Sequence, residues 1–352
     1  MKILSFSVAA YNVERYIERT LESLISCKNI DFLEIIVVND GSKDNTKKII
    51  EKYKDAYPSS IRFIDKENGG HGSTINAAIN IATGKYFKVL DGDDWVNSEN
   101  VDTLVDNLLN EDTDLVLTNY TKAYECHGNQ FRYDKVNIEN VPMQKTLVKN
   151  IQINTGISMH AIAIKTSILQ ENNVSLPEHC FYVDALYDTY SVAYSETVKF
   201  YDLNIYMYRL GRKDQSVSMD SAKKNISMYE KVLLLFFDFI NKAPQNLIEE
   251  KKYLLCRRLL PTAMTIVRVR LAQRNRNAFE KLQNFYSLAN KKNSFLSDYF
   301  FSQNIFCRIS LKNFKYFLIS SIISSLCMML RKIGRRTRLV KIKKKLLKFL
   351  PI

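Results

Sequence analysis

The sequence predicts an α/β fold in which a mostly parallel, Rossmann-like sheet is flanked by helices, followed by a C-terminal helical extension. Over the first 120 residues, short apolar runs alternate with segments whose apolar residues recur at helical spacing. One run, residues 33–40, is apolar along nearly its whole length, as expected for a strand covered on both faces. An alternating strand–helix order of this kind favours parallel pairing.

The expected elements follow one another in a regular order. Asn12 and Asp44 are expected to cap the helices after the first two strands, because Asn and Asp side chains accept hydrogen bonds from helical N–H groups. Residues 124–142 are polar and expected to be irregular, whereas residues 221–304 form a helical region. Strands are expected at residues 3–9, 33–40, 61–65, 85–91 and 113–120, and further helices at 73–82 and from Ser98 onward.

The positive charge of the chain is concentrated in its C-terminal tail. The formal net charge is +14, but residues 312–352 hold twelve Lys and Arg and no Asp or Glu, leaving 39 basic and 37 acidic residues elsewhere. A nucleic-acid-binding protein spreads positive charge over a face of its fold. This near-neutral body with a basic tail therefore predicts no nucleic-acid partner.

The N-terminus and the cysteines indicate the compartment. The apolar stretch Ile3–Ala10 is short and no cleavage pattern follows it, so it is interpreted as a strand rather than a signal peptide. The six cysteines show no CxxC pair or metal-finger spacing and are expected to be free thiols. A cytoplasmic protein is expected.

Polar residues gather where the predicted strands end. Asn12 follows the first strand, "NDGSKD" ends the second, "KENGGHGS" follows the third and "DGDDW" ends the fourth. The carboxyl ends of neighbouring parallel strands meet at one edge of the sheet, where ligands bind in such folds. The sequence therefore predicts one ligand site assembled from several loops.

Asp91, Asp93 and Asp94 form an acidic cluster directly after a predicted strand. Alternate residues of an extended segment point the same way, so Asp91 and Asp93 can face the site together. Carboxylate oxygens suit Mg²⁺ or Mn²⁺, and Mg²⁺ is commonly bound through substrate phosphates as well. The cluster predicts a metal site at Asp91 and Asp93 that a diphosphate completes; the alternative is an acidic turn capping the next helix.

Two further segments suit a nucleotide. Asp40 stands at a strand terminus, where its carboxylate can accept a hydrogen bond from a base or a ribose. The Gly-rich residues 68–72 offer flexible backbone N–H groups to an anion before a helix. The alternative is a pair of ordinary turns, in which Asp44 serves only as a helix cap.

The segments "SVAAYN", "VVNDGSKDNT" and "ENGGHGSTINAAINIATGKYFKVLDGDDW" together resemble the family 2 glycosyltransferases, which have the GT-A fold. The resemblance covers residues 1–120, in order and spacing. It implies sugar transfer, with inversion, from a nucleoside diphosphate sugar that is expected to be UDP-linked, with Mn²⁺ or Mg²⁺ as cofactor. Carried over to this chain, Tyr11, Asn12 and Asp40 line the nucleotide pocket, and Asp91 and Asp93 hold the metal and the donor.

The chain departs from the family pattern in two places. Asn39 stands where the family often has the first of two acids, and residues 74–76 are Thr-Ile-Asn instead of Ala-Arg-Asn. The donor contact of that missing Arg must come from elsewhere or be absent. His71 and Ser73 are the candidates to supply it.

The resemblance also implies a general base on a helix start well after the acidic cluster. In "EHCFYVDALYDTY", Asp184 occupies the position of the family's aspartate, and Val183 replaces the Glu that often precedes it. Asp184 is the expected catalytic residue, and Asp188, one helical turn later, is the competing choice. The structural alternative for Asp184 is a helix N-cap.

The segment "YRLGRKDQSVS", residues 208–218, resembles the family's mobile segment that closes over the diphosphate. Arg209, Arg212 and Ser216 are expected to neutralise the leaving group, because guanidinium groups match phosphate geometry. The alternative is a solvated loop. Trp95, the single tryptophan, either lines the acceptor side or packs under the acidic turn.

Residues 305–352 form a tail that is predicted to associate with an anionic membrane surface. The apolar run Tyr316–Leu330 is shorter than the about 20 residues of a spanning helix. Basic residues and one apolar helical face follow it, as is typical of an interfacial anchor; the alternative is a packed or frayed basic helix. The apolar residues of that face are Leu339, Ile342, Leu346 and Phe349.

These inferences predict a bacterial enzyme of surface-polysaccharide synthesis, peripheral on the inner face of the cell membrane, with a lipid-linked glycan acceptor. Residues 1–220 are the expected catalytic domain, with a donor half at 1–120 and an acceptor half at 121–220. Two alternatives stay open: a nucleotidyltransferase on the same fold, and a non-catalytic membrane-bound scaffold. The sugar, its linkage and the oligomeric state are not specified by the sequence.

Overall fold

The structure, a computed structural model, describes residues 1–126, 130–153, 156–211, 219–244, 248–302, 308 and 310–322. The chain divides into two compact units. The first comprises residues 1–221 and 242–259, and the second comprises residues 222–241 and 260–352. The first unit contains the sheet, and the described part of the second is helical.

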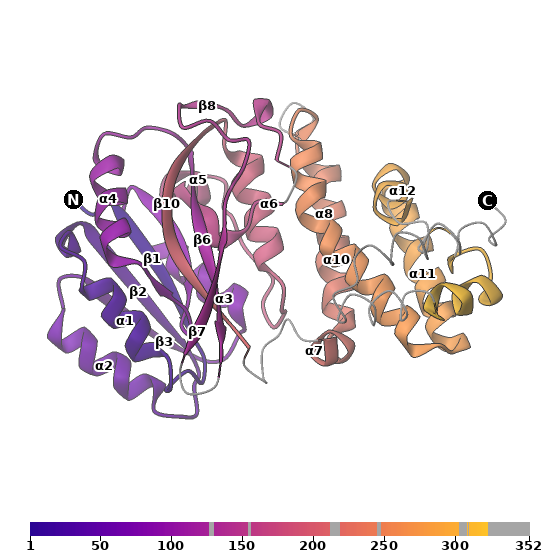
Figure 1. Cartoon of the computed structure of the whole chain (residues 1–352), viewed down its shortest axis with the longest axis horizontal. Coiled ribbons are helices and arrows are strands. Elements are labelled where there is room, and N and C mark those ends of the chain that lie inside the picture. Colours follow the sequence, from indigo (N-terminus) through magenta and orange to yellow (C-terminus); the bar gives the residue numbers. More distant parts are fainter. Residues whose placement is uncertain are drawn as a thin grey trace. The chain divides into compact units, whose positions relative to one another are not determined.

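The first unit is built on a ten-stranded mixed sheet (Figure 1). Its strands are β1 (Leu4–Ala10), β2 (Leu33–Asp40), β3 (Ile61–Lys66), β4 (Tyr86–Asp91), β5 (Trp95–Val96), β6 (Leu115–Glu125), β7 (Phe131–Val136), β8 (Thr146–Leu147), β9 (Ile162–Lys165) and β10 (Thr197–Leu210). Strands β3, β2, β1 and β4 pair in parallel in that spatial order, and so do β6 and β10. Strand β9 runs antiparallel between β4 and β6 and joins the two parallel parts.

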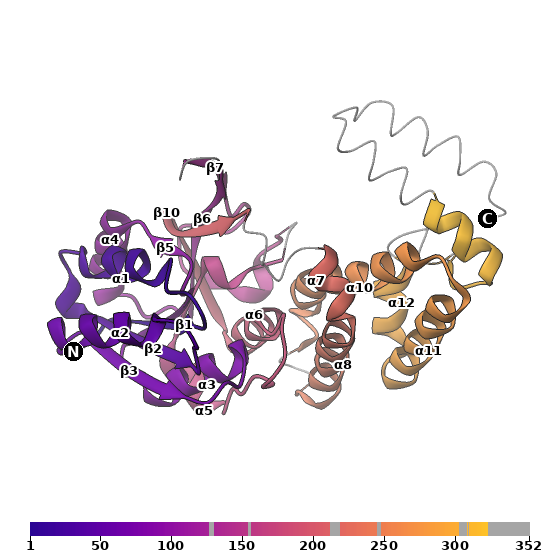
Figure 2. The same cartoon turned by 90° about the horizontal axis from the view of Figure 1, so that it is seen from below.

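Helices cover both faces of this sheet (Figure 2). One face carries α1 (Ile17–Ile25), α2 (Thr46–Ala56) and α4 (Ser98–Leu109), and the other carries α3 (His71–Ile81), α5 (Thr166–Glu171) and α6 (Asp184–Tyr194). Short 3₁₀ turns lie at Ile30–Phe32, Val148–Asn150 and Met159–Ala161. Because both faces are covered, β2 is buried at every position, which explains its nearly continuous apolar sequence.

The C-terminal part of the chain is helical. Its helices are α7 (Met219–Lys224), α8 (Ile226–Lys242), α10 (Lys252–Gln273), α11 (Arg276–Lys292) and α12 (Ser294–Ser302), and residues 314–322 are helical as well. In the second unit, the ring of Phe300 packs on those of Phe236 and Phe237 in an aromatic core. Among the described residues, no helix is both long and apolar enough to cross a membrane. The predicted anchor at residues 331–352 lies outside the described residues.

The sequence prediction of the fold class and of the first strands and helices is confirmed, with two corrections. Residues 131–136 form strand β7 against β6 instead of irregular chain. Asn12 does not cap a helix, because α1 begins only at Ile17. Asn12 instead adopts a left-handed backbone (φ 51°), and its side-chain oxygen accepts a hydrogen bond from the Lys43 N–H.

Glu111 lies in the turn before β6, is 6% exposed, and forms hydrogen bonds with residues of β10 through its carboxylate. Burial raises the pKa of Glu111, but hydrogen bonds from Lys199, Thr113 and Tyr201 outweigh it and lower the pKa to about 2. Because folding lowers the pKa of Glu111, its ionised carboxylate stabilises the folded state at pH values above the unfolded-state pKa of about 4.3. This stabilisation is lost as the pH falls toward 2.

We therefore expect Glu111→Gln to reduce the free energy of unfolding by about 2 kcal/mol at pH 7. The difference from the wild type should shrink as the pH is lowered from 5 to 3, as measured by urea denaturation. The exposed Glu139 supplies the matched control, Glu139→Gln, which should change the stability little at either pH. A pH-independent difference for Glu111→Gln would contradict this account.

Candidate active site

The polar segments that follow β1, β2 and β4 meet at one edge of the sheet. The three strands are neighbours and parallel, and the register places Ala10 beside Asn39 and Ala9 beside Asp91. Residues 11–12, 40–44 and 91–94 therefore leave the sheet together. The structure brings these sequence-predicted segments to one place, as expected for the ligand edge of a parallel sheet.

Tyr11 and Asn12 connect the end of β1 to the segment after β2. Tyr11 is 50% exposed at this edge. The Asn12 N–H donates to the Ser42 hydroxyl at 3.0 Å, and the Asn12 side-chain oxygen lies 2.8 Å from the Lys43 nitrogen. These bonds hold the two strand ends together and leave the Tyr11 ring on the surface of the predicted nucleotide pocket.

Asp40 is 2% exposed and shapes the Gly-rich turn. Its carboxylate accepts the N–H groups of Gly69 at 2.8 Å and Gly70 at 2.7 Å, and the Lys66 ammonium at 2.9 Å. Gly70 has φ 83°, a conformation that favours glycine. Further donors to the same carboxylate are Asn68 and Ser73. Asp40 thus fixes the turn that leads into α3, in addition to standing at the predicted base-binding position.

His71 opens α3 and faces the acidic cluster. Its Nε2 lies 3.0 Å from Oδ1 of Asp91. Burial lowers the pKa of the His71 imidazole, but the carboxylates of Asp91, Asp184 and Asp93 outweigh it and raise the pKa above its ordinary value. His71 thus contacts Asp91 directly, and the charges of Asp93 and Asp184 also act on its imidazole.

The three carboxylates of the acidic cluster lie within 4.8 Å of one another but differ in burial. Asp94 is 1% exposed, and its oxygens accept the Tyr206 hydroxyl at 2.6 Å and the Arg209 N–H at 2.7 Å. Burial, with the adjacent charges of Asp93 and Asp91, raises its pKa well above the ordinary value. Asp94 therefore holds the turn in shape.

Asp91 and Asp93 are the pair in this cluster that fits a divalent cation. Both are partly exposed, and their oxygens offer the hard ligands that Mg²⁺ and Mn²⁺ prefer. The Tyr206 hydroxyl also accepts the backbone N–H of Asp91 at 3.1 Å, so one buried tyrosine supports the turn from both sides. The arrangement fits the predicted metal site.

Tyr206→Phe is expected to lower the free energy of unfolding by about 1–3 kcal/mol, because it removes the hydroxyl that donates to the buried Asp94. Chemical denaturation measures the change. Tyr57→Phe, at a tyrosine that is 38% exposed, is the matched control. Equal stability of the two variants would show that the Tyr206 hydroxyl does not support the turn.

Arg209 lies behind the acidic turn and is 5% exposed. Its Nε donates to the Asp93 carbonyl at 2.8 Å, and its guanidinium lies over the rings of Tyr16, Trp95 and Phe131. Arg209 thus supports the backbone of Asp93, the predicted metal ligand. Its predicted contact with the diphosphate would be a separate role. Arg212 and Ser216 lie outside the described residues.

Trp95 packs beneath the acidic turn and is 7% exposed. The Arg19 guanidinium lies 3.6 Å from the centroid of its ring, and Phe131 meets the ring edge-on at 5.2 Å. Of the two interpretations that the sequence left open for Trp95, this burial favours the packing role.

Asp184 is the first residue of α6, and Val183 occupies the N-cap position, so Asp184 is not the helix cap. Its side chain is 32% exposed, whereas Asp188 is 1% exposed. Burial raises the pKa of Asp188, although the Arg258 guanidinium beside it acts in the opposite direction. A buried carboxylate cannot reach an acceptor in solution, so the geometry favours Asp184 over Asp188 as the base.

The structure adds Arg258 and Tyr206 to the site, neither of which the sequence indicated. Arg258 pairs with Asp184 at 2.6 Å and also with Asp188. It lies 74 residues after Asp184 in a run that reads as an ordinary apolar helix. No local pattern marks such a residue, because its role depends on a distant partner.

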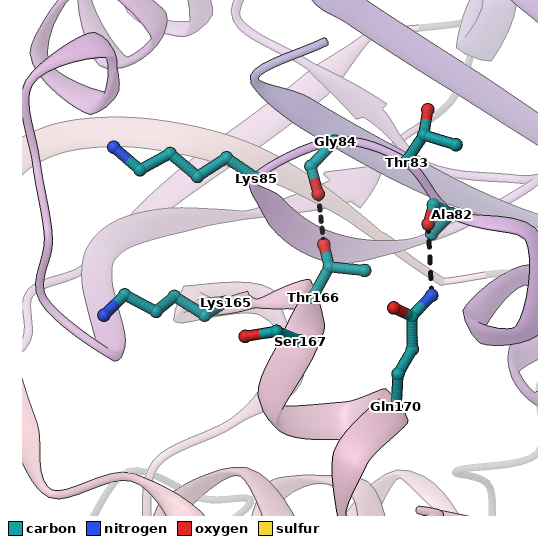
Figure 3. Close-up of a pocket in the computed structure, with 8 residues that line it drawn as sticks. All are labelled: Ala82, Thr83, Gly84, Lys85, Lys165, Thr166, Ser167 and Gln170. Carbon is teal, nitrogen blue, oxygen red and sulfur yellow. Dashed lines mark hydrogen bonds between the residues drawn. The ribbon is translucent and has the colours of Figure 1, made fainter. Parts of the chain in front are cut away.

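A separate pocket lies at the opposite edge of the sheet (Figure 3). It is lined by residues 82–85, just before β4, and by residues 165–167 and Gln170. Thr166 donates to the Gly84 carbonyl across it, and Gln170 donates to the Ala82 carbonyl at 3.1 Å. Since Asp91 ends β4 and this pocket precedes it, the pocket is distinct from the candidate active site.

The N-terminal part of the chain is similar in sequence to a known protein family. Residues 5–172 match the family described as "Glycosyl transferase family 2". The putative glycosyltransferase EpsH of Bacillus subtilis is 36% identical over 131 residues, which cover 37% of this chain and 37% of EpsH. The chain thus spans well under two thirds of that relative.

Two solved structures share the fold. S. aureus TarS, residues 1–349, superposes with a TM-score of 0.66 at 18% identity, over 93% of this chain and 92% of TarS. The mannosyltransferase PcManGT of Pyrobaculum calidifontis has a TM-score of 0.50 at 14% identity, over 92% of this chain and 87% of PcManGT. The sequence match identifies residues 5–172 as a glycosyltransferase family 2 domain, and the fold that the chain shares with TarS, helical extension included, is GT-A.

Proposed function

We propose that the chain is an inverting glycosyltransferase that moves a sugar from a nucleoside diphosphate sugar, UDP-linked, to an acceptor hydroxyl. One observation carries the proposal. The His71 imidazole lies 3.0 Å from Oδ1 of Asp91, and the charges of Asp93 and Asp184 act on the same imidazole, at the carboxyl edge of a parallel sheet. A cation site and a general base at one edge are what sugar transfer from a diphosphate requires.

Relatives of the same fold support the choice of donor and metal. TarS has been solved in complex with UDP-GlcNAc, and PcManGT in complex with GDP-Man and Mn²⁺. In this chain, Tyr11, Asn12 and Asp40 stand where the nucleotide would lie, and Asp91 and Asp93 would hold Mn²⁺ or Mg²⁺. A bound cation supplies positive charge that stabilises the departing diphosphate.

The protein's own residues would carry the transfer in a single displacement. Asp184 accepts the proton of the acceptor hydroxyl as its oxygen forms a bond to the anomeric carbon. The bond from that carbon to the diphosphate oxygen breaks at the same time, and the nucleoside diphosphate leaves. Attack from the face opposite the leaving group inverts the anomeric centre. Asp40 and Arg209, through the turns that they shape, keep the two ends of the donor in place.

The acceptor and the location form the finer part of the proposal. The basic tail, residues 305–352, supports attachment to an anionic membrane surface from the cytoplasmic side. An enzyme seated there suits a lipid-linked glycan acceptor of a surface polysaccharide. On this proposal, residues 1–120 bind the donor, residues 121–220 face the acceptor, and the helical residues 221–304 lead to the tail.

The test is a panel of nucleotide sugars, incubated with the full-length protein and Mn²⁺ and assayed for release of the nucleoside diphosphate. Slow donor hydrolysis without an acceptor, abolished by a chelator, is the expected result. Release of pyrophosphate from a nucleoside triphosphate would instead identify a nucleotidyltransferase. Absence of both reactions and of UDP binding would favour the scaffold alternative.

A further inference from the structure

Residues 251–258 hold helix α6 at both of its ends. At its N-terminal end, the Arg258 guanidinium donates to Oδ2 of Asp184 at 2.6 Å and also to Asp188. At its C-terminal end, the Lys251 ammonium donates to the carbonyls of Ala193 at 2.6 Å and Ser195 at 2.7 Å. A cation at the C-terminus of a helix and an acid in its first turn, here Asp184, both suit the helix dipole. These contacts fall within the first compact unit, to which residues 242–259 belong.

The Arg258 side chain has little freedom at this position. It is 17% exposed, and the backbone of Gly156 packs directly on its Cα, where a side chain at residue 156 would collide. A planar guanidinium can satisfy two carboxylates in one fixed orientation, which an ammonium cannot do. The two carboxylates lie one helical turn apart, so the guanidinium fixes both the start of α6 and the rotamer of Asp184.

The two acids of this cluster stand in different surroundings. Asp188 is 1% exposed and depends on Arg258 for its compensating charge, while the Asp184 side chain is 32% exposed. Arg258 donates its hydrogen bond to Oδ2 of Asp184, the oxygen on the side of Arg258 and the buried Asp188. Oδ1 is then the atom of Asp184 that can turn toward an acceptor hydroxyl.

We propose that Arg258 is a positioning residue for the proton transfer: it holds the Asp184 carboxylate by one oxygen so that the other meets the acceptor. The inference rests on the proposed function and deepens it. It assigns part of the active site to Arg258, which follows the expected catalytic domain in sequence. The alternative is a purely structural role, in which Arg258 only compensates the buried charge of Asp188.

A pair of variants separates these roles. Arg258→Gln removes the contact with Asp184 but also leaves Asp188 buried without its cation, which could unfold the protein. The double variant Arg258→Gln with Asp188→Asn removes that buried charge, so only the support of Asp184 is lost. Arg257→Gln is the matched control, because Arg257 donates instead to Tyr253 on its own helix.

The full-length variants are compared with the wild type by the rate of UDP release from the active donor with Mn²⁺, and by calorimetric binding of UDP. We expect the double variant to lose roughly 10- to 100-fold in kcat, with donor KM and UDP affinity within about twofold of the wild type. The rate of Arg258→Lys should lie between that of the double variant and that of the wild type. The rate of Arg257→Gln should match that of the wild type. A folded double variant with wild-type kcat overturns the inference. If the wild type releases no UDP from any donor, the proposed function fails. If the wild type is active and the folded double variant is equally active, only the role of Arg258 fails.

Discussion

Asp93→Asn is expected to reduce the Mn²⁺-dependent release of the nucleoside diphosphate by roughly 10³-fold, which corresponds to about 4 kcal/mol in the activation free energy. Asp93 is partly exposed beside Asp91, and an amide would offer a neutral oxygen where a divalent cation would be held better by a negatively charged one. Because Asn has nearly the same shape as Asp, packing beneath the turn should be preserved. The rate is measured with saturating donor and Mn²⁺.

A control variant and a binding measurement make the Asp93 result specific. Asp55→Asn removes a carboxylate whose side chain is 74% exposed on the surface, and should leave the rate unchanged. Mn²⁺ titration followed by electron paramagnetic resonance should show weaker binding to Asp93→Asn than to the wild type. If Asp93→Asn binds Mn²⁺ and releases the diphosphate as the wild type does, the assignment of Asp93 is wrong.

Asp184→Asn is expected to lower kcat by roughly 10²- to 10⁴-fold, the range typical of losing a general base. The amide keeps a bond to Arg258 but cannot accept the acceptor's proton. Donor binding should be unaffected, because Asp184 does not lie among the residues predicted to contact the nucleotide. Single-turnover kinetics and UDP calorimetry separate the two effects.

Comparison with Asp188→Asn tests the competing assignment of the base. Asp188 is 1% exposed, so its substitution should change the free energy of unfolding more than it changes kcat. Glu178→Gln, an exposed acid shortly before α6, should affect neither quantity. The opposite ranking, with Asp188→Asn inactive and Asp184→Asn active, would transfer the role of base to Asp188.

The sequence indicated the acidic turn, but it did not indicate the buried residues that support this turn. The spacing of Asp91 and Asp93 suggested that these two side chains face the same way, but it did not show that Asp94 is buried whereas the other two are partly exposed. That difference arises from Tyr206 and Arg209, which come from β10 more than 100 residues later. Burial depends on which strand lies alongside, and β10 reaches the turn only through its pairing with β5 and β6.

Local patterns were sufficient for most of the strands and helices of the first 120 residues and for the ligand edge. The period of apolar residues reflects which face of each element is buried, and a strand such as β2 carries that information in a few consecutive residues. The polar segments after β1, β2 and β4 could likewise be grouped in advance, because parallel strands end at a common edge. The family resemblance was carried by the same segments.

Contacts between distant segments could be found only after folding. Arg258 looks like any other cation of an apolar helix until α6 brings Asp184 and Asp188 to it. The same holds for β7, whose polar sequence gave no strand signal but which pairs with β6. In both cases the stabilising free energy comes from an interaction between two distant segments. Neither segment alone contains a sequence pattern that indicates this interaction.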